Sequence, residues 1–388
     1  MKKALSLVLT LALAASVLAG CSGSGSAPAA TTAAATTAAA AETKAEETKA
    51  EETTAAPAET TAAAPEEKPV TIKLGWAETA EEDGHPLSKA AYTFKREAEA
   101  LSNGSLTIEL YPAAQLGDAA SLLSQVEAGT LECCMSISNG QFATSYYPDL
   151  GFLDIPYLFE NADEASALLD PDSEFFQNLQ ADITAKTGIR PLCFFNEGLR
   201  HITNSKREIK TPEDLKGLKL RTMAVTAHMK MFEAMGASPT QVSWNELYTA
   251  LQTGVVDGQE NPIINAVYLS AWEVQNYMTL DGHVCLCGLF CMNDKFYNTL
   301  SDAQKEAIDT AAMKGRAAEI EMFQNNEAKA LDTLKENGLQ VTELTPEEID
   351  AFRQACQPQV IEYLKGVMDT PELIDTALET VEKIREGK

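Results

Sequence analysis

Residues 243–262 read SWNELYTALQTGVVDGQENP, and this stretch decides the fold. Ser243 with Glu246 three positions later is the signature of a capping box, which predicts a helix over residues 244–253 that the following glycine ends. The short apolar run 255–257 predicts a strand that leads directly into the polar GQENP segment. Helix and strand in close alternation are typical of an α/β protein.

The same alternation extends along the chain on both sides of this stretch. Residues 70–76 place apolar side chains at every second position, as a half-buried strand does, and residues 87–101 carry a helical stripe that Asn103 and Gly104 end. Further strands are expected at 106–111, 131–137 and 218–222, with helices at 119–128 and 226–235. These repeated strand–helix units predict a parallel or mixed sheet covered by helices.

One helix is expected to be unusually long. Ser301 and Gln304 form a second capping box, and no proline occurs between them and Gly338. A single helix of some 35 residues can therefore follow, although its interior Gly315 costs about 1 kcal/mol relative to alanine. A C-terminal helix is expected to start at Thr345, which caps it, with Pro346 in the first turn and Glu348 as the acidic residue.

The N-terminal part has the features of an exported, tethered protein. Residues 1–20 combine two lysines with an apolar run at 4–19 that is too short to span a bilayer, as a signal peptide does. The sequence LAGC at 18–21 resembles the lipobox of bacterial lipoproteins, so Cys21 is the expected lipidation site, with a plain secretory peptide as the alternative. Residues 21–68 are rich in Ala, Thr and Glu and form an expected disordered tether.

Length and charge restrict what the rest of the chain does. The remaining chain has roughly 320 residues, above the size at which one core stops growing, so two lobes are expected. The formal charge of -27 argues against nucleic acid or an anionic membrane surface as partner. A small anion can still bind where a few arginines gather in a dry cleft.

Apart from Cys21, the cysteines leave two interpretations open. An odd number remains, several lie in apolar segments, and no C-x-x-C pair occurs, which favours buried small hydrophobic residues. The alternative is a disulfide or a metal site in an oxidising compartment. The cysteines concerned are Cys133, Cys134, Cys193, Cys285, Cys287, Cys291 and Cys356.

Several sequence segments together resemble the solute-binding subunits of tripartite ATP-independent periplasmic (TRAP) transporters. They are YPAAQLG at 111–117, RHITNS at 200–205, TPEDLKGLKLR at 211–221, GASP at 236–239 and LYTALQTGVVDGQENP at 247–262. The resemblance implies a periplasmic-binding-protein-like fold of two α/β lobes with a long helix that spans both. It also implies delivery of the solute to a membrane permease, driven by an ion gradient.

The resemblance implies lobe boundaries as well. Lobe I would comprise residues 69–197 with 286–325, and lobe II residues 198–285 with 326–388.

Four residues match positions that bind ligand in this family. Arg221 matches the arginine that holds the ligand carboxylate in a bidentate pair, which suits a planar guanidinium. Asn261 matches an asparagine that donates to the same carboxylate, or else it caps the turn before Pro262. Arg200 matches a second arginine near the cleft, and Trp244 is expected to stack on the ligand or to pack in the core.

Two departures from the sialic acid receptors of the family point to another ligand. Ile137 and Ala224 stand where those receptors have polar residues, so we expect a ligand other than sialic acid. A less polar cleft is expected from Met223, Ile137, Trp76 and Trp244. Glu78, His85 and Asn139 are candidate polar contacts from the first lobe, with solvated loop residues as the alternative.

No catalytic, cofactor or metal site is expected. The chain contains no G-x-S-x-G, H-E-x-x-H or P-loop motif, and its four histidines are widely spaced. We therefore expect a receptor for a small organic carboxylate, such as a dicarboxylate or keto acid, anchored by lipid at the outer face of the cell membrane. The alternatives are a sugar-acid or aromatic-acid receptor of the same family, a solute-sensing lipoprotein, or an enzyme with a fold that these motifs do not reveal.

Overall fold

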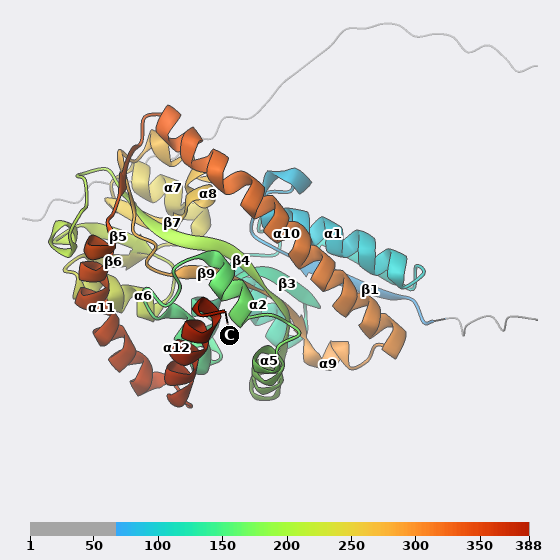
Figure 1. Ribbon diagram of the computed structural model, residues 1–388. Coiled ribbons are helices and arrows are strands. Elements are labelled where there is room, and N and C mark those ends of the chain that lie inside the picture. Colours follow the sequence, from blue (N-terminus) through green and yellow to red (C-terminus); the bar gives the residue numbers. More distant parts are fainter. Residues whose placement is uncertain (1–66, 388) are drawn as a thin grey trace, which may run out of the picture. The chain divides into compact units, whose positions relative to one another are not determined.

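A mixed β-sheet forms the framework of residues 67–387, which the computed structural model describes (Figure 1). Its strands are β1 Val70–Gly75, β2 Leu106–Tyr111, β3 Cys133–Ser138, β4 Ile189–Asn204, β5 Lys219–Thr222, β6 Ser238–Gln241, β7 Gly258–Pro262, β8 Tyr277–Leu280, β9 Cys285–Asn293 and β10 Gln340–Glu343. The strand order is β2-β1-β3-β9-β4-β7-β5-β6, with β8 beside β4 and β10 beside β8. Strands β1, β2 and β3 are parallel, whereas β9 is antiparallel to β3 and β4. The expected mixed sheet is confirmed.

Helices connect and cover these strands. They are α1 Pro86–Leu101, α2 Ala119–Ala128, α3 Asn139–Ser145, α4 Ala162–Leu168, α5 Glu174–Thr187, α6 Thr226–Ala234, α7 Trp244–Gln252, α8 Ile263–Tyr268, α9 Asp294–Tyr297, α10 Asp302–Glu336, α11 Pro346–Val367 and α12 Glu372–Arg385. Short 3-10 helices are η1 Glu82–Gly84, η2 Pro148–Asp154, η3 Pro212–Leu215 and η4 Ala271–Glu273.

Strand β4 links the two halves of the sheet. Its first part, Ile189 to Leu199, pairs with β9, and its last part, Arg200 to Asn204, pairs with β7 and β8. The register shifts between Asn196 and Leu199, where Gly198 has a φ of 88°. A side chain at Gly198 would collide with the ring of Phe323 on α10, so this position requires glycine for two reasons.

Helix α10 is the long helix that the sequence predicts, and it begins with the predicted capping box (Figure 1). Near its start, Ala307 and Ile308 pack in the core around β1, β2 and α1. Near its end, Phe323 and Leu334 pack in a separate core with α7 and α8. One helix thereby joins two hydrophobic clusters, as the prediction of a lobe-spanning helix requires.

The interior glycine of α10 has a packing reason. A methyl group at Gly315 would lie 3.1 Å from the carbonyl oxygen of Ala90 and 3.7 Å from Cβ of Phe94. Helices α1 and α10 therefore approach so closely that alanine would be tight here. The cost in helix propensity is offset by this close packing of two helices.

Most predicted elements are present, but the strand expected at 255–257 is wrong. Val255 is 57 % exposed, and the strand begins only at Gly258. The polar GQENP segment itself forms β7, buried between β4 and β5. It is tolerated there because Gln259 and Glu260 have side-chain hydrogen-bond partners inside the sheet.

The capping box expected at the start of α7 does not form. The helix begins at Trp244 as predicted, but no side chain caps it. The Ser243 hydroxyl donates to the Glu246 carboxylate at 2.7 Å. The capping box at Ser301 is confirmed, and so is the cap at Thr345, which the structure shows to be a capping box as well.

The C-terminal helices pack on elements far away in the sequence. Helix α11 contacts α6, and α12 contacts α4 and η2. Arg385 of α12 donates to Glu164 of α4 at 2.9 Å. The last helix thus lies against residues of the expected first lobe, and the exact lobe boundaries stay a prediction.

The seven cysteines at positions 133 and beyond are free and buried. This agrees with their interpretation as small core residues. The expected signal peptide, the lipidation site Cys21 and almost all of the tether lie outside the described residues. Within residues 67–387, no helix combines the length and the apolar character needed to cross a membrane.

Candidate ligand-binding site

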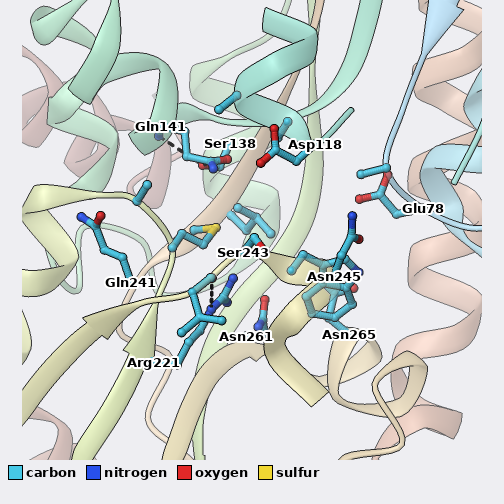
Figure 2. Close-up of a pocket in the computed structure, with 18 of the residues that line it drawn as sticks. Glu78, Asp118, Ser138, Gln141, Arg221, Gln241, Ser243, Asn245, Asn261 and Asn265 are labelled. Carbon is cyan, nitrogen blue, oxygen red and sulfur yellow. Dashed lines mark hydrogen bonds between the residues drawn. The ribbon is translucent and has the colours of Figure 1, made fainter. Parts of the chain in front are cut away.

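A pocket of about 230 Å³ lies beside the ends of β5 and β7 (Figure 2). Six of the eight predicted contact residues line it, namely Glu78, His85, Arg221, Met223, Trp244 and Asn261. The other two, Arg200 and Asn139, do not line it. Residues from distant parts of the sequence therefore converge on one cavity, which is typical of a ligand site.

Arg221 lies in β5 and turns its guanidinium into the pocket (Figure 2). Its Nε donates to the carbonyl oxygen of Val242 at 2.8 Å, which fixes the side chain. Neither Nη1 nor Nη2 donates to another described residue, and Nη1 is buried. Burial lowers the pKa of Arg221 to about 10, a shift that the charge of Glu260 opposes and that of Arg200 reinforces. The group is still a cation at neutral pH, with its terminal nitrogens free for an anion.

Asn261 lies in β7, next to β5, and its side chain points to the same side of the pocket as Arg221 (Figure 2). Its Nδ2 donates to Oε1 of Gln259, so the amide has a fixed orientation. Strands β5 and β7 are parallel, and their carboxyl ends lie at one edge of the sheet. Ligands of α/β proteins commonly bind at such an edge.

Arg200 belongs to a buried ion pair behind the pocket. It is fully buried and donates to Glu260 from Nε at 2.5 Å and from Nη2 at 3.0 Å. Burial tends to raise the pKa of Glu260, but the charge of Arg200 and the hydrogen bond from His283 hold it well below its usual range. Arg200 thus lies one layer behind the pocket, where its positive charge helps to lower the pKa of Arg221.

Asn139 is also one layer away from the cavity. Its Nδ2 donates to Asp154 at 2.9 Å, and its Oδ1 accepts from the backbone N–H of Cys287 at 3.3 Å. Asp154 in turn contacts His228 at 3.1 Å. These contacts satisfy the asparagine within the protein, so it positions neighbouring groups and does not reach the pocket.

His85 enters the pocket as a neutral group. Its Nδ1 accepts a hydrogen bond from the backbone N–H of Leu87, which caps α1. Burial lowers the pKa of His85 to about 4, although a hydrogen bond with Asn265 opposes the shift. The imidazole is therefore uncharged at neutral pH and packs on the ring of Tyr268, with centroids 4.7 Å apart.

Only two of the four residues from which a less polar cleft was expected lie at the pocket. Trp244 and Met223 do line the pocket, but Trp76 and Ile137 lie in the hydrophobic core. Polar residues that the sequence did not single out take their place. These are Asp118, Ser138, Gln141, Glu197, Gln241 and Asn265, with Ser243 and Asn245 beside them.

Two of these unpredicted residues had a signal in the sequence. Asp118 precedes α2 and caps it by accepting from the N–H of Ser121 at 2.9 Å, so an N-cap at the pocket edge was recognisable. Glu197 is a carboxylic acid that follows closely on the apolar run 192–195 of the largely buried strand β4. A buried charge in such a strand commonly marks a functional site.

Glu197 has an unusual protonation state. Burial raises its pKa to about 8, the charge of Glu78 adds to the shift, and Arg200 and a hydrogen bond with Asn265 oppose it. The carboxyl group is therefore mostly neutral at pH 7 and offers an O–H donor. Among the described residues, no three His, Cys, Asp or Glu side chains gather as a metal site requires.

Comparison with known proteins connects this geometry to a family. The family model for bacterial extracellular solute-binding protein, family 7, matches residues 77–366. The 2,3-diketo-L-gulonate-binding periplasmic protein YiaO of Escherichia coli is 31 % identical over 316 residues, which cover 81 % of this chain and 92 % of that protein. An uncharacterised protein y4mM of Sinorhizobium fredii is 33 % identical over 297 residues, covering 76 % of this chain and only 53 % of its relative.

Solved structures match over similar lengths. The sugar acid binding protein DctPAm of Advenella mimigardefordensis, in complex with galactonate, has a TM-score of 0.75 and 30 % identity, covering 82 % of this chain and 99 % of that one. A TRAP periplasmic solute-binding protein of Shewanella oneidensis with bound succinate has a TM-score of 0.74 and 25 % identity, covering 81 % and 99 %. The fold is thus the two-lobed α/β fold of these proteins. The chain belongs to bacterial extracellular solute-binding protein family 7, the family of the TRAP periplasmic solute-binding proteins.

Proposed function

We propose that the chain captures a small organic acid in the pocket, with Arg221 as the group that binds its carboxylate, and delivers it to a TRAP membrane permease without chemical change. The observation that carries the proposal is the state of the Arg221 guanidinium. It is 2 % exposed, its Nε is held by Val242, and no described residue accepts from its two terminal nitrogens.

A carboxylate suits this arrangement for a geometric reason. The two terminal nitrogens of a guanidinium match the two oxygens of a carboxylate in parallel, charge-assisted hydrogen bonds. Asn261, on the neighbouring strand, lies beside Arg221 and can donate from its amide to the same anion. A buried cation without a counter-ion is costly, and binding an anion removes that cost.

The names of similar proteins support the class of ligand. YiaO is named for 2,3-diketo-L-gulonate, and DctPAm was crystallised with galactonate, both of which are acids with several oxygen substituents. The polar walls around Gln141, Gln241 and Asn265 suit hydroxyl or carbonyl groups on such a ligand. We therefore favour an oxygenated acid over a plain aliphatic or aromatic one.

Attachment to the membrane is a separate part of the proposal. The lipobox-like LAGC at 18–21 suggests that Cys21 carries the lipid and that the following segment is a tether. Mass spectrometry of the protein extracted from the membrane tests this, since a diacylglyceryl group on an N-terminal Cys21 is expected. An unmodified Cys21, or a chain cleaved elsewhere, contradicts the anchor but leaves the pocket's role intact.

A thermal-shift screen tests the binding function. The panel contains D-galactonate, D-erythronate, D-glucuronate, 4-hydroxybutyrate, succinate and galactarate, with galactitol as an uncharged control. A ligand at 100 times its Kd stabilises the native state by about 2.7 kcal/mol, so a binding acid raises the melting temperature clearly. The proposal expects at least one acid to do so and galactitol not to. It fails if galactitol matches the acids, or if no acid shifts the folded protein.

A further inference from the structure

Acidic side chains outnumber basic ones in the lining of the pocket. Arg221 is the one Arg or Lys among the described lining residues, whereas three carboxylic acids line the same cavity: Glu78, Asp118 and Glu197. We infer that the pocket selects a monocarboxylate with an uncharged, hydroxyl- or carbonyl-bearing remainder, and that the charges of Glu78 and Asp118 exclude a second carboxylate. This inference rests on the proposed function and adds to it the class of acid.

The acids lie away from the arginine. Figure 2 shows Arg221 and Asn261 together on one side, with Asp118 across the pocket from them and Glu78 at its edge. The three acids come from separate elements, because Glu78 follows β1, Asp118 caps α2 and Glu197 lies in β4. A ligand held at Arg221 by one carboxylate therefore directs its other end toward acidic side chains.

The size of the pocket makes this arrangement selective. Its volume of about 230 Å³ is below the range of roughly 300–1,000 Å³ that is usual for ligand sites. A small acid would therefore contact both walls at once. A second carboxylate has no cation to pair with among the other lining residues, because His85 is held neutral by burial, which lowers its pKa to about 4. Burying such an unpaired charge beside like charges is strongly unfavourable.

Glu197 gives the uncharged remainder a specific partner. It is 8 % exposed, and its Oε1 packs against β9, since a side chain at Gly288 would meet that oxygen at 2.7 Å. Because burial raises its pKa to about 8, the neutral carboxyl can donate to a hydroxyl or carbonyl oxygen of the ligand. Asn265 completes the donor and acceptor set, as its Oδ1 is buried without a hydrogen-bond partner.

Charged and titratable groups face Glu197 from each element packed around it. Glu78 comes from the segment after β1, Arg200 from β4 itself, Glu319 from α10 and Cys287 from β9. Burial raises the pKa of Glu319 well above its usual range, and the charge of Glu197 adds to that shift. The surroundings thus favour the neutral form of Glu197, which loses its donor when the pH rises through about 8.

Matched pairs of acids test the selectivity. Calorimetry at pH 6.5 compares D-galactonate with galactarate and 4-hydroxybutyrate with succinate, which differ in whether the far end is a hydroxyl or a carboxylate. In each pair that binds, the monocarboxylate is expected to bind at least tenfold more tightly than the dicarboxylate. Equal or tighter binding of the dicarboxylate overturns the inference while the proposed function stands. If none of the four acids nor the rest of the panel binds the folded protein, the proposed function fails and this inference with it.

Variants locate the source of the selectivity. Glu78→Gln and Asp118→Asn remove a charge with little change of shape, and asparagine still caps α2. Each is expected to lower the ratio of monocarboxylate to dicarboxylate affinity at least threefold. Glu109→Gln, on the exposed side of β2, is the matched control and leaves the ratio unchanged. Unchanged ratios in both pocket variants contradict the inference.

A pH series separates the role of Glu197. The wild type is expected to lose affinity for its monocarboxylate at least threefold between pH 6.5 and pH 8.8, and Glu197→Gln is expected to lose less, because glutamine does not ionise. Comparing wild type with Glu197→Gln is needed because His283, which lies behind the pocket and has a pKa raised to about 9, also changes its charge in this pH range. Equal pH dependence in wild type and Glu197→Gln removes Glu197 from the account of selectivity.

Discussion

Glu260 accepts two hydrogen bonds from Arg200, from Nε at 2.5 Å and from Nη2 at 3.0 Å, and none from Arg221. The two arginines lie on β4 and β5, on either side of the strand that carries Glu260. One arginine is thus neutralised inside the sheet, while the other faces the pocket with its terminal nitrogens unpaired. The proposed selectivity for an anion follows from this unequal sharing of one carboxylate.

Breaking the Arg200–Glu260 pair should destabilise the protein strongly. Arg200→Met leaves the Glu260 carboxylate buried without its main partner, which is expected to cost about 3–5 kcal/mol in the free energy of unfolding. Guanidinium denaturation measures this cost. The matched control is Lys314→Met, which removes the exposed pair with Glu97 and should cost no more than about 1 kcal/mol.

A double variant refines the same prediction. Arg200→Met with Glu260→Leu removes both charges, so its loss of stability should be smaller than the sum of the two single losses. An unfolding free energy of Arg200→Met within about 1 kcal/mol of wild type would show that the buried pair is not needed for stability.

Stability should fall at alkaline pH through His283. Burial tends to lower the pKa of His283, but the charge of Asp281 and hydrogen bonds to Asp281 and Glu260 outweigh it and raise the pKa to about 9. The pKa of His283 in the folded state exceeds the ordinary value of histidine, so protonated His283 stabilises the fold. Its contribution of up to roughly 3 kcal/mol to the free energy of unfolding is complete below pH 6.5 and is lost as the pH rises through 9. His283→Gln should be less stable near neutral pH yet lose less between pH 6.5 and 9.5.

Denaturation curves at four pH values in that range check this slope. Glu197 contributes in the same direction, because its pKa is also raised in the folded state, to about 8. Glu197→Gln therefore serves as the comparison. If His283→Gln has the same slope as the wild type, the imidazolium is not what the network stabilises.

Two helical glycines, Gly315 inside α10 and Gly366 in the last turn of α11, should respond differently to alanine. Gly366→Ala meets nothing within 4 Å, so it should gain part of the about 1 kcal/mol that alanine contributes in a helix interior. Gly315→Ala would bring its methyl group 3.1 Å from the Ala90 carbonyl oxygen, so that gain should be cancelled or reversed. Melting temperatures of the two variants test the difference, and equal stabilisation would contradict close packing of α1 on α10.

Thiol reactivity should be low in the native protein. Burial raises the pKa of Cys193 and of Cys356 to about 12, and Cys133, Cys134 and Cys291 are shifted upward for the same reason. Little thiolate is then present at pH 8, and access is blocked. A thiol reagent such as Ellman's should modify the seven described cysteines only after denaturation. Rapid reaction of several thiols in the folded protein, or a melting temperature that a reductant lowers, would contradict free buried cysteines.

Local signals in the sequence predicted much of the fold. Caps at Ser301 and Thr345 marked the starts of α10 and α11, because a helix start depends on a few neighbouring residues. Strand β7 was placed too early because its polar residues do not look like a buried strand. Its burial depends on β4 and β5, which are distant in the sequence.

The site was predicted less completely, for the same reason. Arg221 and Asn261 were found through motifs shared with a family, and both line the pocket. Arg200 was singled out without its partner, because nothing local in the sequence pairs it with Glu260. Glu197 was missed although it follows an apolar run, because its raised pKa depends on burial beside Glu78 and Asn265, which only the fold brings together.

Calorimetric titration of Arg221 variants tests the central claim most directly. D-galactonate, or the tightest acid of the panel, is titrated into the wild type, Arg221→Ala, Arg221→Lys and the control Arg96→Ala on the exposed face of α1. We expect Arg96→Ala to match the wild type and Arg221→Ala to bind at least about 30-fold more weakly, since removal of one buried charge partner costs about 2–5 kcal/mol. Arg221→Lys should also bind poorly, because an ammonium lacks the two parallel donors. Wild-type affinity in a folded Arg221→Ala variant would contradict the account.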